Sequence, residues 1–333
     1  MSLFKIGSLA AKPGEKVSGH IEAMELVDGS RLPIAVTLIN GAAEGPTVFV
    51  GGGAHGDEIN GVRAVIDAVG RIDPARLKGR IVAVPVQNPL AFRARYRLIT
   101  FNQLDQQNMH RAFPGSPAGD MASRNCHLIL NDIVVEAGCD LVIDCHTGST
   151  GSYYPPLVFV STIGPDEAVR RSLAAARVFN APFIIAAGGK AGVYAMGSML
   201  HMVAVERGIP AFGCELGTAL PAEARHSDLG AAGIRDVLIH LGMIEGEMGP
   251  RRTQIELEEI HEVRSERGGI CDYLVSPGDE VAKGQAIARV INLFGETVHE
   301  AVSPVDGYVT TCTYWGSINQ GERLARVARK PRT

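Results

Sequence analysis

The chain has 333 residues, of which 46% are hydrophobic and 20% charged, with a formal net charge of −4. This length allows a large domain plus a smaller one, and the mild acidity excludes a strong electrostatic footprint for nucleic acid or a membrane surface. No apolar run approaches the roughly 20 residues that cross a bilayer, and no signal peptide is predicted. Six cysteines without a C-x-x-C pair indicate reduced, buried thiols, so we expect a cytoplasmic protein.

The first 40 residues are predicted to be a β-rich entry segment, with extended stretches at 17–24 and 33–40. From about residue 46 to 245, short β-branched stretches alternate with amphipathic ones. We expect strands at 47–51, 81–86, 141–144, 157–160 and 210–213, and helices at 61–70, 122–138, 165–180 and 228–243. This alternation predicts an α/β domain whose mostly parallel sheet is covered by helices on both faces.

The charged stretch 246–267 is the predicted boundary, so we expect a large domain over 1–250 and a small β-rich domain over 251–333. Two halves of the small domain share a spacing of glycines and a valine: Gly269, Gly278, Gly284 and Val290, then Gly307, Gly316, Gly321 and Val327. Their motifs, PGDEVAKGQ and SPVDGYV, resemble the biotinyl/lipoyl hammerhead barrel, in which a modified lysine sits between the halves. The matching stretch here, FGETVHE, has no lysine, so we expect a structural or interface domain that offers a surface for a homo-oligomer.

The stretch GGGAHGDE follows the first strand of the α/β part. Its Gly51, Gly53 and Gly56 match the dinucleotide fingerprint G-x-G-x-x-G of a Rossmann dehydrogenase. A pyrophosphate, however, needs bare backbone N–H groups at a positive helix N-terminus. Asp57 and Glu58 would repel that anion and would suit a cation, so a metal-binding loop is the better interpretation.

Several polar side chains follow predicted strands. His55 and Glu58 form a His-x-x-Glu pair, which can place both side chains on one side of a turn but is a weak signal alone. His146 ends a second strand in LVIDCHTGS, Glu215 follows a third in PAFGCELGT, and Asn88 follows IVAVPVQ. Active-site residues of open α/β sheets gather outside the carboxyl ends of the strands, so we expect these side chains to converge.

Two histidines and one carboxylate make a three-ligand zinc site that leaves a position for water. We predict about one Zn²⁺ per chain on His55, Glu58 and His146, although another divalent ion would also suit these ligands. Glu215 is predicted to be the general base that takes the proton of the activated water. Asp144 either orients the imidazole of His146 or is an ordinary strand-end aspartate.

Five motifs, GGAHGDE, NPLAFRARYR, NMHRAFPG, DCHTG and CELGT, occur in this order over roughly residues 45–245. In order and spacing they resemble the succinylglutamate desuccinylase/aspartoacylase family of the zinc carboxypeptidase superfamily. The resemblance implies a carboxypeptidase-like three-layer α/β/α domain with a mixed, mostly parallel sheet. It also implies a zinc-dependent hydrolase that cleaves the linear amide, not peptide, bond of a small N-acyl amino acid, such as an N-acetyl or N-succinyl derivative. The alternative is a biotinyl/lipoyl-like carrier or interaction protein without catalytic activity.

The resemblance also assigns roles to residues. His55, Glu58 and His146 look like the zinc ligands and Glu215 like the base, in agreement with the reading of the residues themselves. Arg97 resembles the arginine that polarises the scissile carbonyl, and Arg111 the arginine that clamps the substrate carboxylate.

The chain departs from the family's common D-x-N-R pattern at two positions, Asn108 and His110. His110 replaces an amide that helps to bind the substrate carboxylate. We therefore place His110 and Asn88 with Arg111 in the predicted substrate-binding set, and His110 could instead contact the metal.

Overall fold

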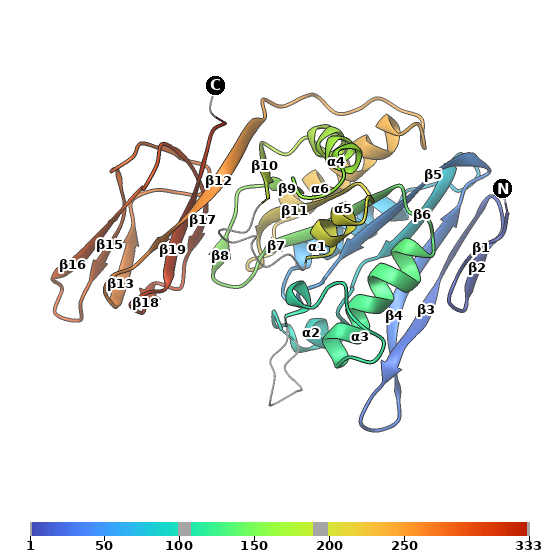
Figure 1. The fold of residues 1–333 in the computed structure, drawn as a ribbon, viewed down its shortest axis with the longest axis horizontal. Coiled ribbons are helices and arrows are strands. Elements are labelled where there is room, and N and C mark those ends of the chain that lie inside the picture. The colour runs from blue at the N-terminus through green and yellow to red at the C-terminus, as the bar shows by residue number, and fades with distance from the viewer. Residues whose placement is uncertain (1, 99–107, 189–198, 332–333) are drawn as a thin grey trace.

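The computed structural model describes residues 2–98, 108–188 and 199–331 of the chain (Figure 1). Its N-terminal part consists of strands. Two hairpins come first, built from β1 (Phe4–Ile6), β2 (Leu9–Ala11), β3 (Glu15–Glu25) and β4 (Arg31–Asn40). The longer hairpin, β3–β4, forms one edge of the large sheet, where β4 pairs antiparallel with β6.

A mixed sheet forms the middle layer of the α/β part. After β3 and β4 its strands are β5 (Ala43–Gly52), β6 (Lys78–Val84), β7 (Leu141–Gly148), β9 (Leu157–Ser161), β10 (Phe183–Ala187) and β11 (Ala211–Thr218). The spatial order is β3-β4-β6-β5-β7-β11-β9-β10. The neighbours β6, β5, β7 and β11 run parallel to one another, whereas β9 is antiparallel to β11. The carboxyl ends of β5, β7 and β11 therefore lie side by side.

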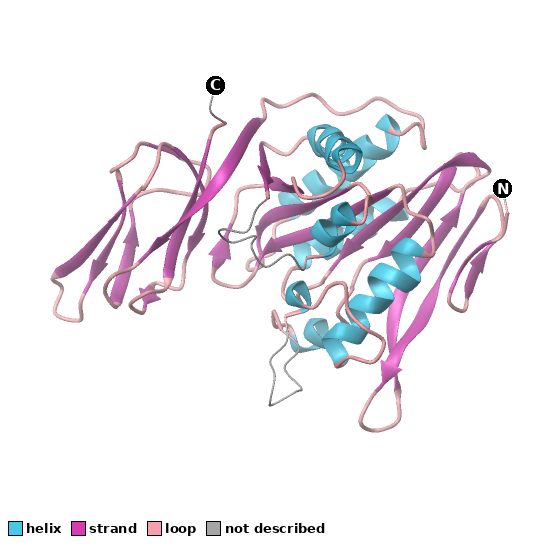
Figure 2. Cartoon of the chain, in the orientation of Figure 1, coloured by secondary structure: helices cyan, strands magenta, loops and turns pink. Residues whose placement is uncertain are grey.

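Helices cover both faces of this sheet (Figure 2). One face carries α1 (Ile59–Gly70), α4 (Asp166–Phe179) and α6 (Ala224–His240), and the other carries α3 (Met121–His127), the π-helical segment η2 (Leu128–Val135) and α5 (Leu200–Glu206). Alternate strand residues enter the two cores: Val48 and Val50 pack in the core of α1 and α6, and Phe49 in that of η2 and α5. This arrangement confirms the predicted three-layer α/β/α fold with a mixed sheet.

The C-terminal β-region, defined here as β12 to β19, is the predicted separate antiparallel part. Its strands are β12 (Ile255–Arg264), β13 (Gly269–Tyr273), β14 (Glu280–Val281), β15 (Ala286–Ile291), β16 (Thr297–Val302), β17 (Gly307–Thr313), β18 (Ser317–Ile318) and β19 (Arg323–Arg329). Strands of the two sequence halves pair with each other: β14 pairs with β17, and β18 pairs with β13. The hairpin between β15 and β16 presents exposed Leu293 and Phe294 rather than a lysine.

The two parts share one continuous sheet. β12 pairs parallel with β10 and antiparallel with β19, and β17 pairs with the short strand β8 (Ser152–Tyr153). The predicted boundary stretch 246–267 therefore contains a strand that belongs to both parts, and a division between residues 250 and 251 stays a prediction. This continuity brings β19 close to the α/β part, where β8 leads into the site described below.

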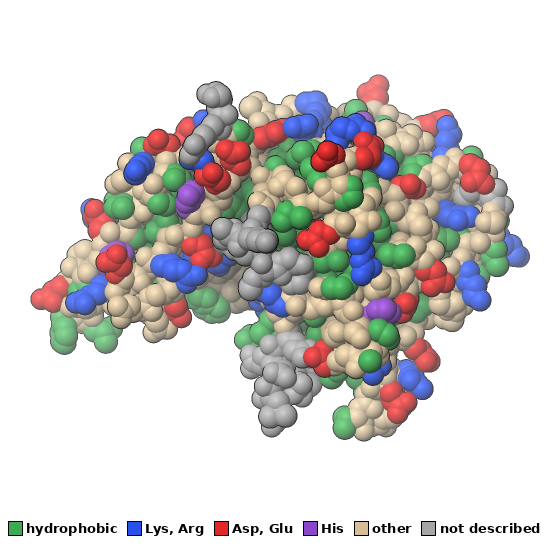
Figure 3. All heavy atoms as spheres, in the orientation of Figure 1, with side chains coloured by type: hydrophobic (Ala, Val, Ile, Leu, Met, Phe, Trp, Pro, Cys, Tyr) green, Lys and Arg blue, Asp and Glu red, His purple; other side chains and the backbone are tan. Residues whose placement is uncertain are grey.

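The surface charges are mixed, as the small net charge of the sequence predicts. On the face shown in Figure 3, acidic and basic side chains are interspersed. None of the described helices is long and apolar enough to span a membrane.

Candidate metal centre and active site

The loop between β5 and α1 carries the first two candidate ligands. His55 and Glu58 are only 2% and 1% exposed, and Glu58 occupies the N-cap position of α1. Between them, Gly56 packs directly against the backbone of Ala91, which leaves no room for a side chain. A Cβ atom at Gly56 would lie 1.9 Å from the carbonyl oxygen of Ala91, so a larger residue would displace the loop.

Asn88 follows β6 (Lys78–Val84), and its side chain makes local contacts. Its side-chain oxygen caps α2 (Pro89–Ala94) by accepting a hydrogen bond from the backbone N–H of Ala91 at 3.2 Å. Its amide group donates to the carbonyl oxygen of Ala54 at 3.2 Å. Asn88 is not among the described residues that line the pocket. An asparagine before a proline is a favoured helix cap, and this local role occupies the side chain that we expected to bind substrate.

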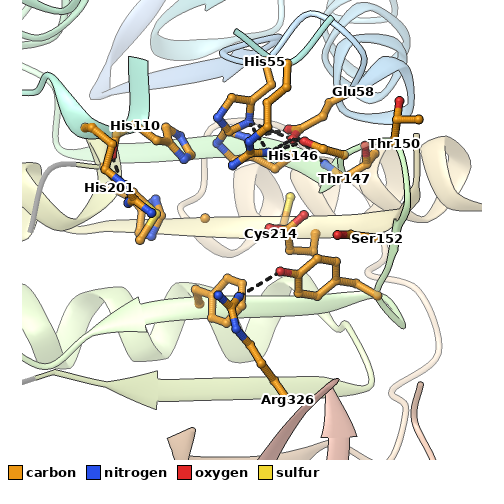
Figure 4. Close-up of a pocket in the computed structure, with 18 of the residues that line it drawn as sticks. His55, Glu58, His110, His146, Thr147, Thr150, Ser152, His201, Cys214 and Arg326 are labelled. Atoms are coloured by element: carbon orange, nitrogen blue, oxygen red, sulfur yellow. Dashed lines mark hydrogen bonds and ion pairs between the residues drawn. The ribbon is translucent and has the colours of Figure 1, made fainter. Parts of the chain in front are cut away.

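The carboxylate of Glu58 contacts both candidate histidine ligands (Figure 4). Its Oε1 lies 2.7 Å from Nδ1 of His55, and its Oε2 lies 2.8 Å from Nδ1 of His146. The hydroxyl of Ser149 donates to Oε1 at 2.9 Å. The structure thus brings together the three side chains that the sequence placed in one metal site.

The second nitrogen of each imidazole also faces a polar oxygen. Nε2 of His55 lies 3.0 Å from Oδ1 of Asn108, and Nε2 of His146 lies 2.9 Å from Oδ2 of the fully buried Asp144. Gln87 donates to the other oxygen of Asp144 at 2.8 Å. A partner on the far nitrogen fixes the orientation of a ligand imidazole, so the orienting role of Asp144 gains support over that of an ordinary strand-end aspartate.

His110, on the 3-10 helix η1 (Met109–Arg111), lies within this cluster. Its ring centroid is 4.5 Å from that of His55 and 4.3 Å from that of His146, and candidate ligand atoms of the three histidines lie within 4.8 Å of one another. Burial, together with the two neighbouring histidines, holds the pKa of His110 well below its usual range. His110 therefore contributes a neutral imidazole beside the candidate ligands.

The residues present fit a divalent metal such as zinc. Imidazole and carboxylate donors are the ligands that catalytic zinc sites use. The site also attracts a cation within the protein itself, because Nη1 of Arg97 lies 3.4 Å from Nδ1 of His55 and 3.2 Å from Oε1 of Glu58. Although burial alone would raise the pKa of the Glu58 carboxyl, His55 and His146 lower it well below its usual range. The buried carboxylate thus stays ionised, as a metal ligand must.

Glu215 lies beside this cluster on β11. In the pairing of β11 with the adjacent parallel strand β7, Glu215 lies opposite His146. Its Oε2 atom is buried and makes no hydrogen bond to any described residue. Burial and the nearby carboxylate of Glu58 raise the pKa of Glu215 to about 8. This carboxyl group is therefore poised to exchange a proton near neutral pH.

A cavity of about 320 Å³ opens over these groups. Four arginines are among the residues that line it: Arg97, Arg111, Arg323 and Arg326. Burial, and then the nearby positive charges of Arg97 and Arg326, lowers the pKa of Arg111. The structure thus gathers the predicted residues Glu215, Arg97, Arg111 and His110 around one pocket.

Sequence reasoning missed several residues of this pocket. Ser149 and Tyr154 come from the segment that follows β7, and His201 is the second residue of α5. Arg323 and Arg326 come from β19, far from the motifs. Residues three apart lie on opposite faces of a regular strand, so RLARVAR gave no local signal that both arginines line one pocket.

Comparison with known proteins defines the class. A family model described as the succinylglutamate desuccinylase/aspartoacylase catalytic domain matches residues 44–241. The chain belongs to the succinylglutamate desuccinylase/aspartoacylase family, as its motifs predicted.

Individual relatives resemble most of the chain. The N-alpha-acetyl-L-2,4-diaminobutyric acid deacetylase of Halomonas elongata is 30% identical over 307 residues, which are 89% of this chain and 85% of the relative. The product-bound ectoine utilization protein EutE (DoeB) from Ruegeria pomeroyi has a TM-score of 0.84 at 26% identity and covers 95% of each chain. A succinylglutamate desuccinylase/aspartoacylase structure from Rhodobacter sphaeroides has the same TM-score and identity and covers 96% of each chain. The likeness extends over the C-terminal β-region.

Proposed function

We propose that this protein is a zinc-dependent amidohydrolase that removes a small acyl group from an N-acyl amino acid. The observation that carries the proposal is the convergence of two imidazole Nδ1 atoms on the Glu58 carboxylate, beside Glu215 and in an arginine-lined pocket. The relative from Halomonas elongata, whose name states that it deacetylates an N-acetylated diamino acid, supports the same class of reaction.

In this proposal His55, Glu58 and His146 hold the metal, and Asp144 and Asn108 keep the two imidazoles in place. When bound, zinc lowers the pKa of a coordinated water molecule toward about 7 and polarises a carbonyl oxygen. His110 lies close enough to serve either the metal or the substrate. Its neutral ring can donate a hydrogen bond to a substrate carboxylate, or accept one from a substrate amide N–H.

Glu215 moves the proton. It accepts one from the attacking water as the new C–O bond forms, and it then passes this proton to the amine nitrogen, so that the amide C–N bond breaks and the amine departs. A carboxyl group whose pKa lies near the pH of the reaction can both accept and release a proton. In the loaded site the added positive charge favours the ionised form of Glu215, which is the form that accepts a proton.

The arginines bind and stabilise charge. Arg97 extends its guanidinium toward Glu58 and Ser149, and in this place it can donate to the oxygen of the scissile carbonyl as negative charge develops. Arg111 lines the pocket with an exposed side chain and suits the substrate carboxylate, which a guanidinium can bind through two parallel hydrogen bonds. Asn88 acts indirectly, by holding the loop of His55.

A screen of N-acyl amino acids for amine release tests this function, with the purified protein assayed before and after chelation and after zinc is restored. We expect release from at least one N-acetyl or N-succinyl amino acid, loss of that activity on chelation, and recovery with zinc. Activity that survives complete metal removal, or a metal-saturated protein that releases no amine from any member of the panel, would contradict the proposal.

A further inference from the structure

His201 is a pocket residue that neither the sequence motifs nor the proposed mechanism uses. It is 2% exposed and lines the cavity over the candidate metal centre. Figure 4 shows its ring next to His110, at one end of this cavity. The Nδ1 atom of His201 is buried and makes no hydrogen bond to any described residue. A buried polar atom of this kind requires an explanation, because an unsatisfied ring nitrogen costs folding free energy.

The buried carboxylate of Asp144 supplies the explanation. Its Oδ2 atom faces three imidazole nitrogens: Nε2 of His146 at 2.9 Å, Nδ1 of His201 at 3.6 Å and Nε2 of His110 at 3.7 Å. Although burial alone would raise the pKa of the Asp144 carboxyl, His146 and then His110 and His201 lower it well below its usual range. A carboxylate that stays ionised in the interior is stable only where polar or charged groups surround it, and His201 is one of these groups.

The pairing of β7 with β11 makes room for His201 beside this carboxylate. In the register of the two strands, Gly213 on β11 lies opposite Asp144 on β7. The ring of His201 packs on this glycine, and a Cβ atom at Gly213 would lie 2.6 Å from the Cε1 atom of the ring. The lack of a side chain at Gly213 therefore lets an imidazole from α5 approach Asp144.

The two oxygens of Asp144 have different partners. Gln87 donates to Oδ1 at 2.8 Å, whereas His201 faces Oδ2, the same oxygen that faces His146. Rotation about the Cβ–Cγ bond of an aspartate has only a broad energy minimum, so contacts to both oxygens are needed to fix the carboxylate. If the ring of His201 is removed, one of these contacts is lost on the side of the carboxylate that serves His146.

We propose that His201 is a positioning residue, which holds the Asp144 carboxylate against Nε2 of His146 and so strengthens metal binding by that histidine. This inference rests on the zinc site of the proposed function, in which Nδ1 of His146 binds the metal. A carboxylate on the far nitrogen fixes the orientation of a ligand imidazole and raises its basicity. His201 acts through Asp144 and is not itself assigned as a ligand.

Zinc affinity, measured on the full-length protein by competition with a chelator of known affinity, tests this route. His201→Leu removes the ring nitrogens at similar size. We expect zinc to bind about 3- to 10-fold more weakly, a smaller loss than for a direct partner of a ligand histidine. His201→Asn keeps an amide N–H near the position of Nδ1, so its affinity should return to within about twofold of the wild type.

Gly213→Ala is a second, independent variant. It leaves the imidazole of His201 intact, but the added Cβ atom displaces the ring from its place beside Asp144. Zinc binding should therefore weaken as it does in His201→Leu. An unaltered zinc affinity in both variants would overturn the inference.

His226→Leu is the matched control. His226 is also a buried histidine whose ring packs on a glycine of β11, Gly217, but it is not among the described residues that line the pocket. Its substitution should lower the unfolding temperature, as the loss of a packed side chain does, and leave the zinc affinity unchanged. An equal loss of zinc affinity in His226→Leu and His201→Leu would mean that His201 serves only the packing of the core.

A double-mutant cycle shows whether the effect passes through Asp144. In the Asp144→Asn background, His201→Leu should cause little further loss of zinc affinity, because the charge that it positions is already gone. Fully additive losses would overturn the route. A dependence of zinc affinity on His201, in a protein that hydrolyses no N-acyl amino acid, would keep this inference and remove the proposed function. A wild-type protein that binds no zinc would overturn both.

Discussion

Glu215 on β11 and His146 on β7 are register partners in adjacent parallel strands. The same register pairs Gly213 with Asp144 and Cys214 with Cys145. Partners in neighbouring strands project to the same side of a sheet, so the backbone pairing itself holds the proposed base beside a proposed ligand. The distance between Glu215 and His146 is therefore set by strand pairing rather than by a loop.

Removing the charge of Glu215 tests its role as the base. Glu215→Gln should lower kcat by about 10²- to 10⁴-fold, because the water loses its proton acceptor, while KM and zinc content change little. Steady-state kinetics and metal analysis check both. Glu206→Gln, an exposed position at the end of α5, is the control and should retain full activity. Undiminished kcat in Glu215→Gln would remove the assignment.

The raised pKa of Glu215 predicts a pH dependence of stability in the metal-free protein. Its pKa of about 8 lies above the ordinary value of 4.5, so the folded protein retains a proton that the unfolded chain has lost between these values. Stability should therefore fall as the pH rises from about 5 to about 8, by an amount on the order of a few kcal/mol.

Urea unfolding at several pH values measures this effect. Glu215→Gln should remove much of the decline, so that the variant becomes more stable than the wild type at the alkaline end of the window. Parallel pH curves for the two proteins would mean that Glu215 carries no raised pKa in the folded state.

The buried Asp144 should control metal affinity through His146. Asp144→Asn leaves a group of the same shape but removes the charge that faces Nε2 of His146 at 2.9 Å. We expect zinc affinity to fall about 10- to 100-fold, as for other partners of ligand histidines. Competition with a chelator of known affinity measures the change. An unaltered zinc affinity would reduce Asp144 to a residue that only supports the fold.

A substitution of His110 shows whether its side chain contacts the substrate or the metal. In His110→Asn we expect the protein to retain about one zinc per chain, since three other donors remain, and to show a KM altered severalfold. Metal analysis and steady-state kinetics on the same preparation check this. A loss of zinc as complete as that of a ligand variant would assign His110 to the metal instead.

The sequence predicts the α/β fold because short apolar, β-branched stretches alternate with amphipathic stretches of helical length. It also predicts that His55, His146 and Glu215 meet, because each lies near the end of a strand and parallel strands bring such ends together. In the structure β7 and β11 continue to Gly148 and Thr218, so His146 and Glu215 lie within the strands rather than after them.

The roles of several pocket residues cannot be predicted from a local sequence pattern. Arg97 and Arg111 gain a role only from the family motifs, because an arginine by itself suggests a surface ion pair. Arg326 reaches the pocket through the pairing of β19 with β12, a strand that lies in a stretch whose charge resembles that of a linker. Asn88 caps α2 in the structure, and its predicted role in substrate binding stays a prediction.

Zinc content is the measurement that tests the central claim most directly. We predict about one zinc per chain in the wild type, nearly none in His55→Ala after dialysis, and an unchanged content in His20→Ala, an exposed histidine on β3. Loss of zinc from His55→Ala should be accompanied by loss of amine release and, in the wild type, by a lower unfolding temperature after chelation. A wild-type protein that binds no divalent metal, or a His55→Ala variant that keeps its zinc, would contradict the account.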